Sequence, residues 1–207
     1  PYIQQESELY EFNFELTLIK TLSLLNKLSE EWIGLYQASL DYIDCDFLLE
    51  LINNDENMKI QILSLLLVNN VLRSENFESV LTKPIMETFT RKISNSSMKV
   101  KECALTGFFL GADKFTQEQI DDLVDWGLLE LMMDFFISDS ESLTSDNATA
   151  LWKMFSKSNN AREHGLDYLE ELEQLFYETE SKKLKSALYL LLLVLRKTNN
   201  NFDEDFD

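Results

Sequence analysis

The stretch ECALTGFFLGADKFTQEQIDDLVDWGLLELMMDFF, Glu102–Phe136, decides the fold of this chain. Apolar residues recur in both halves at the three- to four-residue spacing of a helix, without the alternation of a strand. The first half is strongly apolar, and the second half, after a polar break, is amphipathic. A helix that is apolar on most sides has to be covered by other helices, because it cannot face water. The stretch therefore predicts a long buried helix followed by shorter helices that cover it.

The same arrangement recurs along the whole chain. Four further apolar segments precede or follow Glu102 at a spacing of about 40 residues, which is typical of armadillo and HEAT repeats. They are LIKTLSLLNKL from Leu18, QILSLLLVNNVL from Gln61, NATALWKMFSK from Asn147 and LKSALYLLLLVLR from Leu184. Shorter amphipathic pieces lie between them, and polar clusters such as NNDEN and KSNN mark the breaks, where Asn and Ser can cap a new helix.

Composition agrees with an all-α fold. The 207 residues are 45% hydrophobic and include only 5 Gly and 2 Pro, too few for the turns of a sheet protein. The repeat spacing predicts a right-handed α-solenoid of about five armadillo- or HEAT-like repeats, forming a single domain over residues 1–197. The competing interpretation is a compact irregular helical bundle. Residues 198–207 are polar and acidic and are predicted to be a disordered tail.

Two motifs resemble armadillo repeats of the importin-α family. The segment EQIDDLVDWG from Glu118, together with Asp134, is similar to the E-Q-I-x-x-L-V-x-x-G turn and the following helix of that family. EHGLDYLEELE from Glu163 resembles the start of the last importin-α repeat. Gly127 is expected at a positive φ between two short helices, and Asp167 is expected to cap a helix. The resemblance implies a non-enzymatic adaptor that binds a protein segment on a concave face, with nuclear protein import as one role.

In that family, W-x-x-x-N motifs on the long helices hold the bound peptide. Most of this array is missing here, since Leu22 and Leu65 stand in the place of Trp. The resemblance together with apolar character predicts a set of partner-binding residues on the long helices. These residues are Asn26, Asn69, Leu105, Phe108, Phe109, Trp152, Met154 and Ser156.

The net charge of −19 points to the class of partner. An acidic surface repels nucleic acid and anionic membranes, and it attracts basic protein segments. We therefore expect a protein partner, a basic or extended segment, and neither nucleic acid nor membrane. The alternative is a structural or regulatory armadillo scaffold, such as a formin-like regulatory domain or a chaperone cofactor, that binds a folded partner through its edge.

Catalytic and metal-binding chemistry is not expected. The chain has one histidine, His164, and none of the phosphate-binding, dinucleotide-binding or zinc-protease motifs. No cofactor and no metal are predicted, and the chain is not expected to be an enzyme. Cys45 and Cys103 lie in apolar helical segments far apart in the sequence, which is typical of reduced core thiols in a cytoplasmic or nuclear protein.

Overall fold

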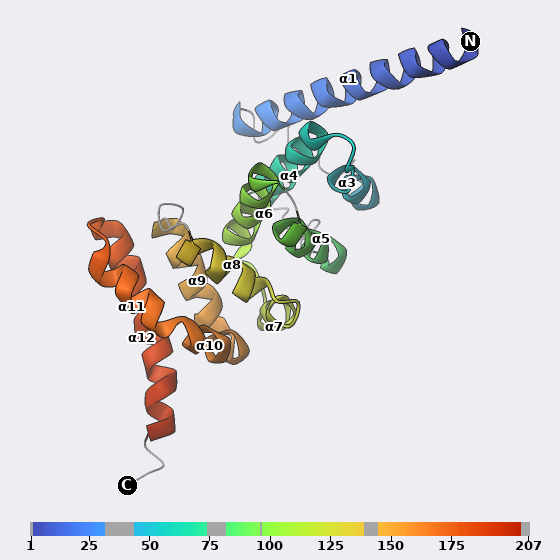
Figure 1. The fold of residues 1–207 in the computed structure, drawn as a ribbon. Helices are drawn as coiled ribbons and strands as arrows, with labels where there is room; N and C mark the ends of the chain where they lie inside the picture. Colours follow the sequence, from blue (N-terminus) through green and yellow to red (C-terminus); the bar gives the residue numbers. More distant parts are fainter. Residues whose placement is uncertain (1, 32–43, 74–81, 96, 139–144, 204–207) are drawn as a thin grey trace. The chain divides into compact units, whose positions relative to one another are not determined.

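The structure, a computed structural model, describes residues 2–31, 44–73, 82–95, 97–138 and 145–203 (Figure 1). All regular secondary structure in these ranges is helical, as the sequence predicts. The chain divides into two compact units, Pro1–Gly107 and Phe108–Asp207.

The first unit consists of long helices covered by short ones. Its helices are α1 (Tyr2–Glu31), α3 (Cys45–Ile52), α4 (Met58–Arg73), α5 (Lys83–Asn95) and most of α6 (Met98–Gly111). The long helix α1 packs along α4, and the short helix α3 packs against both α4 and α5 (Figure 1). The core of this unit is mainly aliphatic, with Leu48, Ile52, Leu65 and Val68 all buried, together with Phe89. The buried surface of α4 explains why its sequence is apolar on most sides.

The second unit repeats this organisation. After the end of α6 come α7 (Gln117–Asp125), α8 (Leu128–Ser138), α9 (Ser145–Lys157), α10 (Asn159–Gly165), a 3-10 turn η2 (Leu166–Tyr168), α11 (Leu169–Glu178) and α12 (Lys182–Asp203). The long helices α9 and α12 pack side by side, and α10 contacts both of them as well as α7 (Figure 1). Phe136 and Phe155 are among the largest fully buried side chains.

Local signals in the sequence explain where several helices begin. Thr116 caps α7 in a capping box with Gln119, whose side chain accepts from the Thr116 backbone. Ser158, in the KSNN cluster, accepts from the backbone of Ala161 at 2.9 Å and caps α10. Gly127 separates α7 from α8 at φ 74°, which confirms the expected positive φ. This conformation is strained for residues that have a Cβ, whereas glycine adopts it readily.

One local prediction is wrong. Asp167 was expected to cap a helix, but it lies inside the turn η2, and α11 begins after Tyr168 without a side-chain cap. The chain passes from α10 through η2 to α11 with helical backbone angles at Gly165, Leu166 and Leu169. No extended residue is available there for a cap, because an N-cap residue usually has β-region angles.

In each unit, helices that carry an apolar segment alternate with amphipathic helices, as the sequence predicts. We call the first set the long helices and the second set the short helices, although α5 and α9 both have 13 residues. All five apolar segments lie on the long helices α1, α4, α6, α9 and α12. Helix α12 continues to Asp203 and so includes part of the predicted tail, while residues 204–207 lie outside the described part. A single domain over residues 1–197 remains a prediction. None of the described helices has an apolar stretch sufficient to cross a membrane.

Candidate functional site

The two asparagines predicted to bind a partner instead tie long helices together. Asn26 on α1 donates to the carbonyl oxygen of Leu63 on α4 at 2.9 Å, and its own oxygen accepts from Asn70 at 3.0 Å. Asn69 on α4 donates to the carbonyl oxygen of Cys103 on α6 at 2.8 Å. Both side chains are buried, so these amides are occupied within the first unit.

Asn69 also sits in a tightly packed position. Its Oδ1 is buried and has no hydrogen-bond partner in the described part of the chain. A Cβ at Gly107 would lie 2.7 Å from this oxygen and 2.4 Å from Cε2 of Phe89, so a side chain at this glycine would collide with both. Gly107 therefore allows α6 to approach α4 closely enough for the Asn69 hydrogen bond.

Of the other six predicted residues, three are buried, two are partly exposed and one is exposed. Leu105, Phe108 and Met154 are each 2% exposed or less, and their side chains are part of the hydrophobic core. Phe109 and Trp152 are partly exposed, and Phe109 packs against Phe136 with ring centroids 5.5 Å apart. Ser156 is exposed, and its hydroxyl donates to the carbonyl oxygen of Trp152 at 2.7 Å. The eight residues do not converge on one surface within either unit, and their role in binding stays a prediction.

An open groove in the first unit lies where α4 and α6 begin. We call it the methionine groove; it has a volume of about 610 Å³ and is lined by Met58, Lys59, Ile62, Leu63, Ser97, Met98 and Lys99. Its lining is almost entirely apolar, and Met58 and Met98 are 49% and 57% exposed. Methionine side chains adapt their shape to a bound apolar group. The groove thus offers an adaptable apolar floor between two lysines.

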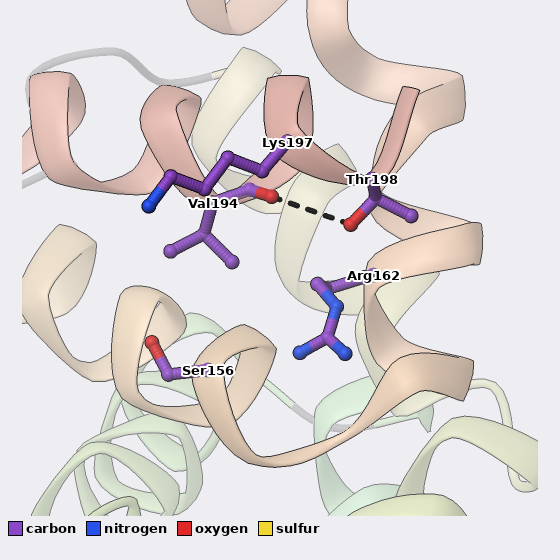
Figure 2. A pocket seen from close by; sticks show the side chains of 5 residues that line it. All are labelled: Ser156, Arg162, Val194, Lys197 and Thr198. Atoms are coloured by element: carbon purple, nitrogen blue, oxygen red, sulfur yellow. Dashed lines mark hydrogen bonds between the residues drawn. The ribbon is translucent and has the colours of Figure 1, made fainter. Parts of the chain in front are cut away.

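A smaller groove in the second unit lies between α9, α10 and α12. We call it the arginine groove; it has a volume of about 300 Å³ and is lined by Ser156, Arg162, Val194, Lys197 and Thr198. Figure 2 shows Arg162 and Ser156 on one side of the space and the three α12 residues on the other. Arg162 donates to the carbonyl oxygen of Phe155 at 2.6 Å, and Thr198 donates to that of Val194 at 3.3 Å. The lining provides two cations and two hydroxyl groups.

Charge is segregated between long and short helices, and the sequence prediction missed this. Helices α4, α6 and α9 carry two Lys or Arg each and α12 carries five, eleven in all, against three acidic residues, Glu102, Asp146 and Asp203. The six short helices α3, α5, α7, α8, α10 and α11 carry four Lys or Arg against fourteen acidic residues. Helix α1 is an exception, with two Lys and six Glu. Counting charges separately on the long and short segments would have revealed the pattern from the sequence.

Several of these cations have partners within the chain: Lys153 pairs with Asp113 and Arg196 with Glu173. Lys157 donates to the carbonyl oxygens of Ala112, Asp113 and Phe115, just beyond the end of α6, at 2.7 to 3.3 Å. Burial lowers the pKa of this lysine. Within the described part of the chain, the ammonium groups of Lys59 and Lys99 form no ion pair, and both residues are exposed beside the methionine groove.

Ionisable clusters suited to metal binding do not occur among the described residues. Cys45 and Cys103 are free thiols, and burial raises the pKa of each, with nearby carboxylates adding to the effect. His164 lies near the carbonyl oxygen of Asn160, with its Nδ1 at 3.1 Å, on the same helix turn. The single histidine and the two cysteines are thus parts of separate helices without a shared site.

Comparison with solved structures identifies the fold. A computationally designed armadillo repeat protein for modular peptide recognition matches with a TM-score of 0.71 at 15% identity, over 87% of this chain and 76% of that one. A designed armadillo repeat protein in complex with the peptide (KR)4 matches with a TM-score of 0.65 at 15% identity, over 93% and 86%. A further engineered protein matches with a TM-score of 0.68 at 19% identity, over 87% and 75%. No protein-family model matches the sequence, and no curated protein does.

The chain therefore has an all-α armadillo-repeat fold, as the repeat spacing predicts. The three matching structures named above are of designed or engineered proteins, and none of the three is an importin-α.

Proposed function

We propose that this protein is a non-enzymatic scaffold that binds a segment of a partner protein across its long helices. The observation that carries the proposal is the pair of open grooves, each beside the long helices of one unit. Two of the structurally similar designed proteins are described as recognising or holding peptides. A repeat fold suits this task because each repeat adds another length of the same binding surface.

The kind of segment is a separate question. The importin-α resemblance and the net charge suggested a basic segment and a role in nuclear import. The W-x-x-x-N array is mostly missing, and the amides of Asn26 and Asn69 are buried and hydrogen-bonded within the chain. The long helices other than α1 are also mostly basic, with eleven Lys or Arg against three acidic residues. These observations support segment binding in general, and they give no support to the capture of a nuclear-localisation signal.

Selection from an unbiased peptide library displayed on phage tests the proposal directly. Enriched peptides are titrated against the wild-type protein and against variants that place a bulky neutral side chain on a long helix, Thr106→Trp on α6 and Ser156→Trp on α9. Both positions are exposed. Gln117→Trp on α7 and Gln174→Trp on α11 are matched controls, because these exposed residues lie on short helices.

The expected result is that at least one long-helix variant weakens binding by tenfold or more, about 1.4 kcal/mol, and that both controls bind like the wild type. The proposal fails if no peptide is enriched, or if only the short-helix variants weaken binding.

A second function, binding of a folded partner at the edge, is favoured by one observation. Tyr177 on α11 and Tyr189, Leu190 and Leu193 on α12 are all exposed, with Tyr177 at 71%. A shallow pocket lined by Phe176, Lys185, Ser186, Tyr189 and Leu190 lies among them. Exposed apolar groups gathered in this way commonly mark interaction surfaces. If Tyr189→Lys abolishes binding of the selected partner while Thr106→Trp and Ser156→Trp leave it unchanged, this second function replaces the first.

A further inference from the structure

The methionine groove and the charge of the long helices together define a class of partner. Helices α4 and α6, which form the groove, carry Lys59, Arg73, Lys99 and Lys101, and Glu102 is their single acidic residue. The groove is lined by the first turns of both helices, where the helix dipole adds further positive potential. The two helices therefore carry four cations against one carboxylate, although the whole chain carries a net charge of −19. Three further carboxylates lie near the start of α4: Glu15, which accepts from Asn57, Asp55, which pairs with Lys92, and Glu56.

The geometry of the groove adds an apolar requirement. Lys59 and Lys99 directly follow Met58 and Met98 in the sequence, and all four residues line the groove. Ile62 and Leu63 on the next turn of α4 complete the apolar floor. A ligand that fills this groove needs an apolar side chain for the floor and negative charge beside it for the two lysines.

A nucleic acid satisfies only the second requirement. Its phosphates would meet the lysines, but the aliphatic floor provides no aromatic platform for base stacking. A protein segment can instead combine carboxylates with apolar side chains and so satisfy both requirements.

Building on the proposed function, we propose that the segment bound by this scaffold is acidic and apolar. An apolar side chain of the partner occupies the methionine groove, and neighbouring Asp or Glu carboxylates pair with Lys59 and Lys99. The proposed segment thus has a charge opposite to that of the basic segment that the net charge alone predicts. The local charge of the contact surface decides the sign, because exposed charges farther away than about 10 Å are largely screened at moderate salt.

Fluorescence anisotropy with defined probes tests this assignment. The labelled acidic peptide DEFDELDEFDEL, its charge-reversed counterpart KRFKRLKRFKRL and a single-stranded oligothymidylate are each titrated with the intact protein. The variants are Lys59→Glu, Lys99→Glu and Met98→Gln in the groove. Arg91→Glu on the short helix α5 is the matched control, because it makes the same change in net charge at an exposed position of the same unit.

The acidic peptide is expected to bind, each lysine variant to weaken it about fivefold, and Met98→Gln to weaken it about threefold. Arg91→Glu should change the affinity by less than about twofold, since long-range charge is screened. Raising NaCl from about 50 to 500 mM should weaken binding about tenfold, because the charges at the groove are exposed.

The remaining outcomes separate the two proposals. If the basic peptide binds better and Thr106→Trp or Ser156→Trp weakens it, segment binding stands and the acidic preference is overturned. If the oligothymidylate competes for the groove with equal or higher affinity, the ligand is a nucleic acid and the acidic-peptide assignment is also overturned. If Arg91→Glu weakens the acidic peptide as much as the groove variants do, the attraction is non-specific and the groove assignment falls.

Discussion

The side-chain amide of Asn69 donates a 2.8 Å hydrogen bond to the carbonyl oxygen of Cys103, and so joins the two long helices α4 and α6. Asn26 makes the equivalent contact between α1 and α4 through the carbonyl oxygen of Leu63. These asparagines occupy the positions that the importin-α resemblance assigned to a bound peptide. In this chain they hold neighbouring long helices together.

Replacing Asn69 by Ala should therefore destabilise the protein without reducing peptide binding directly. The variant loses a buried hydrogen bond and leaves a small cavity, which together should lower the free energy of unfolding by about 1–3 kcal/mol. Urea denaturation followed by circular dichroism measures the change. Peptide affinity, measured well below the unfolding transition, should stay within about twofold of the wild type. An unchanged unfolding midpoint together with a large loss of peptide affinity would instead assign Asn69 to the binding site.

Gly165 should be intolerant of a side chain because of packing. A Cβ at this buried position would lie 2.7 Å from Cζ of Phe155 and 3.0 Å from Cδ2 of Leu195, at the contact of α9, α10 and α12. We expect Gly165→Ala to lower the free energy of unfolding by about 1–3 kcal/mol through overpacking. Adding Phe155→Leu should recover part of this loss in a double-mutant cycle.

Gly127→Ala is the matched control for that cycle. Its cost of about 1 kcal/mol comes from the positive φ of 74° and not from crowding, since the nearest atom to an added Cβ is 3.8 Å away. Phe155→Leu should give no recovery in the Gly127→Ala background. Equal recovery of stability in both backgrounds would show that Phe155 does not crowd a side chain at position 165.

The pair of Asp55 and Lys92 should make stability depend on acid pH. Lys92 is buried and its ammonium group lies 2.9 Å from the exposed Asp55 carboxylate. The hydrogen bond from Lys92 and its positive charge hold the pKa of Asp55 below its ordinary value of 3.8. A carboxyl group whose pKa is lowered by folding stabilises the folded state above the unfolded-state pKa, and this contribution is lost as the pH falls through the folded-state pKa.

Thermal unfolding of wild type and Asp55→Asn across pH 2.5 to 7 checks this sign. The variant should be less stable by a constant amount above about pH 5, and the difference should shrink as the pH falls below about 4. A difference that grows on acidification would mean that the Asp55 carboxylate does not favour the folded state. Glu118→Gln, an exposed acidic residue on α7, controls for loss of one negative charge.

The two thiols should react slowly while the protein is folded. Burial raises the pKa of Cys103, and burial with the carboxylates of Asp44 and Asp46 raises that of Cys45. A smaller thiolate fraction slows alkylation, since the thiolate is the nucleophile. Iodoacetamide labelling at pH 8, followed by mass spectrometry, should be slower at both residues than in a urea-unfolded sample. Equal rates in the two samples would contradict the described burial.

Sequence patterns predicted the helices well because the burial of apolar residues is periodic. The five long segments and the positive φ at Gly127 follow from helical spacing and from the conformational freedom of glycine. The failure at Asp167 has a local cause, because the helical angles around Gly165 and η2 leave no extended residue for a cap.

The site was harder to predict than the fold. Leu105, Phe108 and Met154 are apolar residues on the right helices, but apolarity alone cannot distinguish the buried side of a helix from its exposed side. The methionine groove could not be predicted because Met58 and Met98 are 40 positions apart, and only the packing of α4 and α6 places them together. The net charge predicts a basic partner, which stays a prediction; that charge averages acidic short helices with the basic long helices α4, α6, α9 and α12.

The most direct test of the central claim is a two-dimensional amide NMR titration of the isotopically labelled protein with the acidic peptide DEFDELDEFDEL. The account predicts that the largest chemical-shift changes fall on the first two turns of α4 and the first turn of α6, around Lys59, Ile62 and Lys99, and that they saturate with increasing peptide. Changes confined to the acidic short helices α7, α8 and α11, or no saturable change on α4 and α6, would contradict it.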